Sequence, residues 1–212
     1  MADSDINGLA QAQAGYVDST DELIIQKSGE TSCKKIQVDD LFGGWKDLMP
    51  YEYTNGTGTN APSFTLLPDG VTGDWAFGVN DERWLKYHVD HDMKQGDIMY
   101  PHIHLTVAGT NTNIVRFQID FSIVNSHGVA AWPATATTQI IDTTPNGLTN
   151  IEYTTEGTGV ATPLPDTLIK LHIKRIANGG TENPGTVWMH AVDWHYPTQM
   201  FATKNRTPNF YT

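Results

Sequence analysis

"NIVRFQIDFSIVN", residues 113–125, alternates between apolar and polar side chains along its length. The apolar positions are Val115, Phe117, Ile119, Phe121 and Ile123. Side chains on a strand point to opposite faces with a period of two, so this pattern predicts a strand with one face in a core and the other toward water or a partner. The same rhythm recurs in "DTLIKLHIKRI", residues 166–176, and "TVWMHAVDWHY", residues 186–196.

Around these three segments, short runs of aromatic and β-branched residues are separated by connectors such as "TTPNGLT", residues 143–149. Counting the runs gives about eight to ten mostly antiparallel strands and no convincing long helix. The sequence therefore predicts an all-β domain, a jelly roll or β-sandwich, with extended N- and C-terminal arms.

One segment, residues 36–53, does not have the alternating pattern of a strand. Its apolar side chains have the spacing of a short amphipathic turn or helix: Leu41, Phe42, Trp45, Leu48 and Met49.

The predicted β domain covers residues 36–196. Residues 1–35 are polar and acidic and hold too few large apolar side chains to fold by themselves. They form either a disordered tail or an arm that becomes ordered on a neighbouring subunit. Residues 197–212 are either a frayed end or a second arm. Apolar anchors that would suit docking on another subunit are Met200, Phe201, Phe210 and Tyr211.

The net charge of the chain excludes some partners. With 24 acidic and 13 basic residues, the formal charge of -11 would repel a nucleic acid or an anionic membrane surface. The single cysteine, Cys33, excludes an intrachain disulfide. No charged start followed by an apolar run indicates a signal peptide, and no apolar run approaches the roughly 20 residues of a membrane span. We therefore expect synthesis and retention in a cytoplasm, without nucleic acid or membrane partners.

Two histidines in "GDIMYPHIHLTVAG", residues 96–109, are the strongest candidate for a site. On a strand His102 and His104 share a face, with Cα atoms roughly 7 Å apart, close enough to bind one ion. Asp193 and His195 share a face of the last predicted strand. The set His102, His104, Asp193 and His195 suits zinc or a similar divalent ion. The alternative is a hydrogen-bonded polar cluster in which Asp193 orients an imidazole.

The opposite face of that last strand should carry Trp188, Trp194 and Tyr196. These aromatic side chains could stack on sugar rings or fill the core. Core packing is favoured because Val192 lies between them on the same face.

No catalytic residue emerges from the sequence. No serine lies in a G-x-S-x-G turn, and the glycine-rich stretches lack the Lys and Ser/Thr of a phosphate-binding loop. The spacing from Gly96 to His104 matches the G-x5-H-x-H half-motif of cupins, but Ala108 and Gly109 stand where a cupin would offer its acid. We therefore expect a protein that is not an enzyme and has no cofactor other than a possible divalent metal.

The segments "WKDL" at 45–48, "GDIMYPHIHL" at 96–105 and "DWHY" at 193–196 resemble a family of tailed-bacteriophage virion proteins with P-H-x-H and D-x-H-Y strand motifs. The resemblance covers about residues 40–200. It implies a structural capsid decoration or cement protein, made in the bacterial cytoplasm and located on the virion surface. Its partners would be the major capsid protein and copies of itself, as a trimer. The alternatives are a metal-dependent cupin-like enzyme and a carbohydrate-binding tail protein.

Overall fold

A computed structural model describes residues 22–25, 34–37, 44–56, 60–125 and 131–198. Within these ranges every regular element is a strand apart from a single 3₁₀ position, so the all-β prediction is confirmed. None of these residues belongs to a helix with the length and hydropathy of a membrane span. The predicted interface residues Met200, Phe201, Phe210 and Tyr211 lie outside the described residues, so their role stays a prediction.

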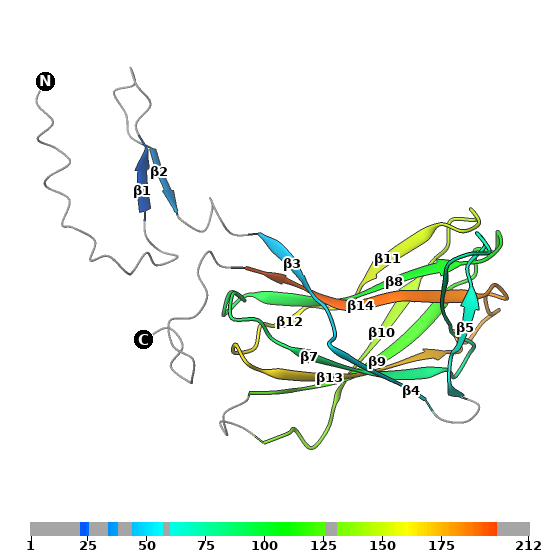
Figure 1. Cartoon of the computed structure of the whole chain (residues 1–212). Helices are drawn as coiled ribbons and strands as arrows, with labels where there is room; N and C mark the ends of the chain where they lie inside the picture. The colour runs from blue at the N-terminus through cyan, green and yellow to red at the C-terminus, as the bar shows by residue number, and fades with distance from the viewer. Residues whose placement is uncertain (1–21, 26–33, 38–43, 57–59, 126–130, 199–212) are drawn as a thin grey trace, which may run out of the picture.

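Two antiparallel sheets face each other across the core (Figure 1). The five-stranded sheet has the order β10–β9–β13–β7–β4. Its strands are β4 (Glu52–Asn55), β7 (Glu82–His88), β9 (Val115–Val124), β10 (Thr137–Thr143) and β13 (Leu168–Ile176). The inward side chains of β9 are those of the alternating pattern, and Phe121 and Ile119 are paired in register with Leu171 and Ile173 of β13.

The seven-stranded sheet has the order β11–β8–β14–β6–β5, with β12 paired to β8 and β3 paired to β14. Its strands are β3 (Trp45–Leu48), β5 (Ser63–Leu66), β6 (Gly73–Ala76), β8 (Ile98–Val107), β11 (Glu152–Glu156), β12 (Val160–Ala161) and β14 (Val187–Pro197). Two further strands, β1 (Glu22–Ile25) and β2 (Lys34–Gln37), pair with each other in a sheet of their own. Both lie at or before the predicted boundary between the N-terminal arm and the β domain.

The strand order is that of a jelly roll. Along the chain, β6 and β7 lie in different sheets, and so do β7 and β8, β8 and β9, β10 and β11, and β13 and β14. Without the outermost strands β4 and β5, the two sheets read β7–β13–β9–β10 and β6–β14–β8–β11. This arrangement of eight strands is the double Greek key of jelly-roll domains. The prediction of a jelly roll or β-sandwich is confirmed.

Large side chains fill the space between the sheets. Trp194, Tyr87, Tyr196, Phe77 and Phe117 are among the largest fully buried residues. The Trp194 ring packs edge-on against Phe121 and Tyr87, with ring centroids 5.1 and 6.4 Å apart. The core interpretation is therefore confirmed for Trp194 and Tyr196, and the interior of the sandwich is occupied by the chain's own side chains.

An irregularity in β14 changes the face on which Trp188 lies. The register with β8 shifts between Met189 and Ala191, so one extra residue interrupts the alternation. Met189 is consequently buried in the core, while Trp188 lies on the outer face and donates its Nε1–H to Thr65 Oγ1 at 2.8 Å. The prediction that Trp188 shares a face with Trp194 and Tyr196 is wrong for this reason.

The described part of the segment predicted as a short amphipathic turn or helix, residues 36–53, holds the end of β2, all of β3 and the start of β4 instead, and Leu41 and Phe42 lie outside the described residues. β3 pairs with the end of β14, and β4 pairs with β7 in the other sheet. Gly44 and Thr198 are neighbours at the end of the β3–β14 pair, where the Thr198 N–H donates to the Gly44 carbonyl at 2.7 Å. The chain therefore enters and leaves the sandwich at one point.

Candidate metal centre

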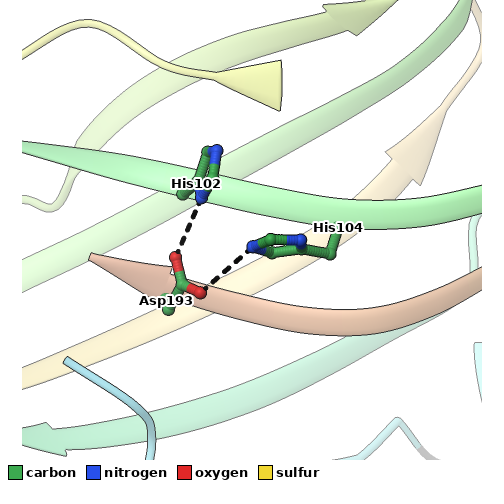
Figure 2. Close-up of side chains that lie close together, drawn as sticks. All are labelled: His102, His104 and Asp193. Carbon is green, nitrogen blue, oxygen red and sulfur yellow. Dashed lines mark ion pairs between the residues drawn. The ribbon is translucent and has the colours of Figure 1, made fainter. Parts of the chain in front are cut away.

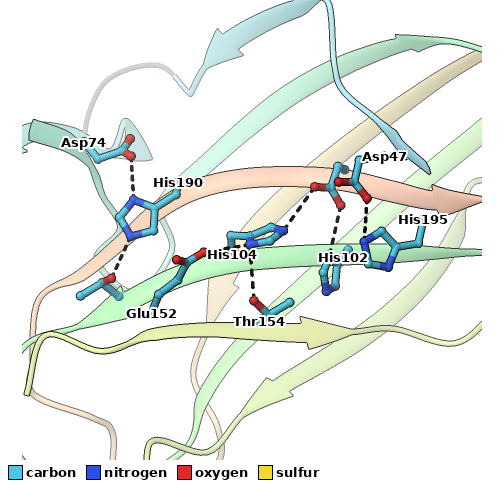
Figure 3. A network of polar contacts seen from close by, with 10 residues as sticks. Asp47, Asp74, His102, His104, Glu152, Thr154, His190 and His195 are labelled. Atoms are coloured by element: carbon cyan, nitrogen blue, oxygen red, sulfur yellow. Dashed lines mark hydrogen bonds and ion pairs between the residues drawn. The ribbon is translucent and has the colours of Figure 1, made fainter. Parts of the chain in front are cut away.

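The outer face of the seven-stranded sheet carries a network of histidines and carboxylates (Figure 3). β8 contributes His102 and His104, because the alternating residues Ile103 and Leu105 point into the core. β14 contributes Asp193 and His195 by the same alternation around the buried Trp194. The structure thus brings together all four residues that the sequence predicts for a metal site.

Asp193 lies between the two histidines of β8 (Figure 2). Asp193 Oδ1 is 3.3 Å from His102 Nδ1, and Asp193 Oδ2 is 3.3 Å from His104 Nε2. His102 and Asp193 are direct cross-strand partners, which fixes their separation. Each carboxylate oxygen therefore faces one imidazole nitrogen.

Asp47 of β3 is a further member that the sequence analysis missed. It is the cross-strand partner of His195, and its Oδ1 lies 2.7 Å from His195 Nε2. The His195 ring centroid is 4.0 Å from that of His102. Asp47 belongs to the segment predicted as a turn or helix, so no sequence pattern placed it next to β14.

Two overlapping groups of side chains result. The potential ligand atoms of His102, His104 and Asp193 all lie within 4.8 Å of one another, and so do those of Asp47, Asp193 and His195. Imidazole nitrogens and carboxylate oxygens are ligands of zinc and related divalent ions. Either group has the composition of a metal site, and Asp193 belongs to both.

The centre of the network is buried and incompletely hydrogen-bonded. The side chains of His102 and Asp193 are 8% and 3% exposed. Although His102 Nδ1 and Asp193 Oδ1 are close, they lack the alignment of a hydrogen bond, and neither has another partner among the described residues. A fully hydrogen-bonded polar cluster, the alternative interpretation, would leave neither atom unpaired.

Burial also changes the charge of these groups. Removal from water, with a smaller contribution from His195 and His104, lowers the pKa of His102 to about 4. Burial raises the pKa of the Asp193 carboxyl to about 6, against the opposing effect of His104. At neutral pH His102 is therefore a neutral imidazole and Asp193 a carboxylate, which are the protonation states that bind metal.

Other polar side chains of this face make hydrogen bonds with the network or next to it. His104 Nδ1 lies 3.0 Å from Glu152 Oε1 on β11. His190 Nδ1 lies 2.9 Å from Asp74 Oδ2 (Figure 3), and His190 Nε2 lies 2.8 Å from Thr106 Oγ1, so both nitrogens of the ring are paired. His190 is therefore a satisfied histidine that lies outside both groups.

The imidazoles point away from the core. The opposite side of β8 is lined by buried Met99, Ile103, Leu105 and Val107. The structure consequently places the histidine pair on an outer sheet face and not in a cavity between the sheets.

No protein-family model and no curated protein matches the chain. Among solved structures, it is similar to the CBM36-1 domain of a multidomain xylanase from the hindgut metagenome of Trinervitermes trinervoides (12% identity, 72% of this chain and 96% of that chain, TM-score 0.35). It is also similar to CsCBM6-3 from Clostridium stercorarium in complex with cellobiose (14%, 73% and 93%, TM-score 0.36). A third similar structure is infectious bursal disease virus Gt strain (14%, 88% and 38%, TM-score 0.35). Similarities this distant carry no inference about function.

Proposed function

We propose that this chain is a non-enzymatic structural protein of a phage particle, a decoration protein that associates with its own copies and binds the major capsid protein on the outside of the shell. The proposal rests on the sequence resemblance and on one structural observation. That observation is an apolar edge of the sandwich, which has the character of an interface between chains.

The apolar edge consists of Tyr53 on β4, and Phe64 and Leu66 on β5, with Trp75 and Arg83 beneath them. β4 and β5 are the outermost strands on this side of the two sheets. The three outer side chains are 47%, 61% and 57% exposed. Phe64 packs edge-on against Trp75 with ring centroids 5.6 Å apart, and Arg83 lies 4.9 Å from the ring centroids of both Tyr53 and Trp75.

These contacts connect the two sheets into one surface. Outermost strands also present backbone groups that can pair with another chain. Exposed apolar patches of this kind mark interaction sites on folded proteins. We infer that the apolar edge is the contact between copies, and that the trimer implied by the resemblance forms through it.

We expect the full chain to form an oligomer, measured by native mass spectrometry and light scattering. The double variant F64S/L66S should be a monomer, because it removes the exposed apolar side chains from one strand and leaves the buried core residues unchanged. Ile140→Ser is the matched control: Ile140 is 48% exposed on β10, the outermost strand on the other side of the five-stranded sheet, and its replacement should leave the oligomer intact.

The location is tested separately. In the culture that naturally produces this chain, gradient-purified phage particles should contain it in a fixed ratio to the coat protein, measured by quantitative mass spectrometry. A monomer that stays in the particle-free fraction would contradict the proposal.

A second candidate function is carbohydrate binding, which one observation favours. Trp84 is 42% exposed on the outer face of the five-stranded sheet and stacks on His172, with ring centroids 4.9 Å apart and an interplanar angle of 22°. Polar side chains adjoin it, because His172 contacts Glu82 and Asp120. An exposed indole beside hydrogen-bonding groups can stack on a sugar ring.

If this face binds glycans, a glycan array should give hits that disappear in Trp84→Ala and persist in Trp45→Ala, which removes an exposed indole from the other sheet. An array without hits would eliminate this second candidate and leave the structural proposal unaffected.

A further inference from the structure

We propose that the outer face of the seven-stranded sheet binds one divalent transition-metal ion of the zinc class through His102, His104 and Asp193, and that this ion fastens β8 to β14. The site is on a different surface from the apolar edge. The proposal therefore does not depend on the proposed function.

The first argument is the spacing of the ligand atoms. In a tetrahedral site with zinc–nitrogen and zinc–oxygen bonds of about 2.0–2.2 Å, neighbouring ligand atoms lie about 3.3–3.6 Å apart. Asp193 Oδ1 lies 3.3 Å from His102 Nδ1, and Asp193 Oδ2 lies 3.3 Å from His104 Nε2. One potential ligand atom from each of the three residues lies within 4.8 Å of the other two, so small side-chain movements would bring them to the separation that one shared ion requires.

The second argument is the pair of buried atoms without hydrogen bonds. His102 Nδ1 and Asp193 Oδ1 are both buried and unpaired among the described residues, and they face each other. A buried polar atom without a partner destabilises the fold, and a buried charge does so more strongly. A cation bound between them would satisfy both atoms at once.

The third argument is the orientation of His104. Its Nδ1 lies 3.0 Å from Glu152 Oε1, a contact that favours the tautomer with the proton on Nδ1 and the lone pair on Nε2. In that tautomer the lone pair faces Asp193 Oδ2 at 3.3 Å. A cation bound there would join the imidazole to the carboxylate. A carboxylate behind a metal-binding histidine is the usual outer contact of zinc sites.

The ligand set also determines which ion fits. Two imidazoles and one carboxylate suit zinc and its neighbours, whereas magnesium and calcium prefer oxygen ligands. Three protein ligands leave one tetrahedral position for water. Asp47 and His195 form the second group with Asp193, so β3 contributes a carboxylate beside the proposed site.

The test uses the full chain, stripped with a chelator and then dialysed. Isothermal titration calorimetry with Zn²⁺ should show one site per chain, and the melting temperature should rise when Zn²⁺ is added. Co²⁺ should give the visible absorption spectrum of a tetrahedral site. Mg²⁺ at the same concentration should show no binding and should not raise the melting temperature.

Variants locate the ion. Asp193→Asn should abolish the Zn²⁺ site and the rise in melting temperature. His104→Gln should do the same, and because His104 is only partly buried, it provides the test if Asp193→Asn fails to fold. Glu152→Ala should weaken Zn²⁺ binding roughly 10- to 100-fold by removing the outer contact of His104.

His190→Gln is the matched control. His190 lies on the same strand and the same sheet face, but both its nitrogens are paired with other residues. Zn²⁺ binding should be unchanged in this variant. Failure of the unmodified chain to bind Zn²⁺ would overturn the proposal, and so would a site that survives either Asp193→Asn or His104→Gln.

Discussion

Replacing Trp194 with alanine should lower the free energy of unfolding by about 3–5 kcal/mol, the range for removing a large aromatic side chain from a core. Trp194 is fully buried and touches aromatic rings from two strands of the opposite sheet, Tyr87 of β7 and Phe121 of β9. A cavity at this position would remove the ring contacts that join β14 to these two strands. Urea denaturation followed by circular dichroism measures the change.

Two further variants make this test specific. Trp45→Ala removes the same side chain from a position that is 63% exposed, and we expect a loss below about 1 kcal/mol. Trp194→Phe should cost less than Trp194→Ala, because it keeps a ring in the core and removes an indole N–H that has no hydrogen-bond partner among the described residues. Equal losses for Trp194→Ala and Trp45→Ala would contradict the assigned core.

Arg175→Met should lower the free energy of unfolding by about 2–4 kcal/mol, since a buried hydrogen bond to a charged group contributes about 1.5–3 kcal/mol. Arg175 is 4% exposed at the end of β13, and burial lowers the pKa of its guanidinium. It donates to the Phe77 carbonyl at 2.7 Å and to the Asn183 carbonyl at 3.0 Å. Methionine can fill the volume but leaves both carbonyls without this donor.

Lys174→Met is the control for this variant. Lys174 is the next residue back on the same strand and lies on the outer face, where a substitution should change stability by no more than about 0.5 kcal/mol. The same urea titration serves for both variants. If Arg175→Met lowers the free energy of unfolding no more than Lys174→Met does, the hydrogen bonds from Arg175 to the two carbonyls do not stabilise the fold.

Local sequence pattern was enough to predict the fold class. The alternation in β9 and β13 reports directly which side chains face the core, because the strand period is fixed by backbone geometry. The connectors rich in Gly, Pro and Asn then limited the strand lengths. Together they predicted an all-β sandwich or jelly roll, and the strand order of both sheets agrees with it.

Where pairing between distant segments decided the structure, the sequence was not enough. β3 is a strand because it pairs with β14, some 150 positions later in the chain, and its apolar spacing by itself suggested a helical turn. The irregularity at His190 was equally invisible, because which residue is left out of the β8–β14 register depends on both strands. This is why Trp188 was assigned to the wrong face.

For the candidate site, too, local alternation could be predicted and the pairing of distant strands could not. His102 and His104 follow from alternation within one strand, and Asp193 and His195 from alternation within another. Their meeting depends on β8 and β14 being neighbours with His102 opposite Asp193. Asp47 could not be found from the sequence, since it joins the site only through the β3–β14 pairing.

The meeting of Gly44 and Thr198 has a mechanical consequence. If the chain is pulled at these two positions, the load falls on the first bond of the antiparallel β3–β14 ladder, and each bond breaks before the next is loaded. Such peeling needs far less force than sliding two strands lengthwise, so β3 should detach early under tension while the rest of the sandwich holds. A fluorophore or cargo attached at Gly44 would also lie next to one attached at Thr198, because the two residues are hydrogen-bonded neighbours.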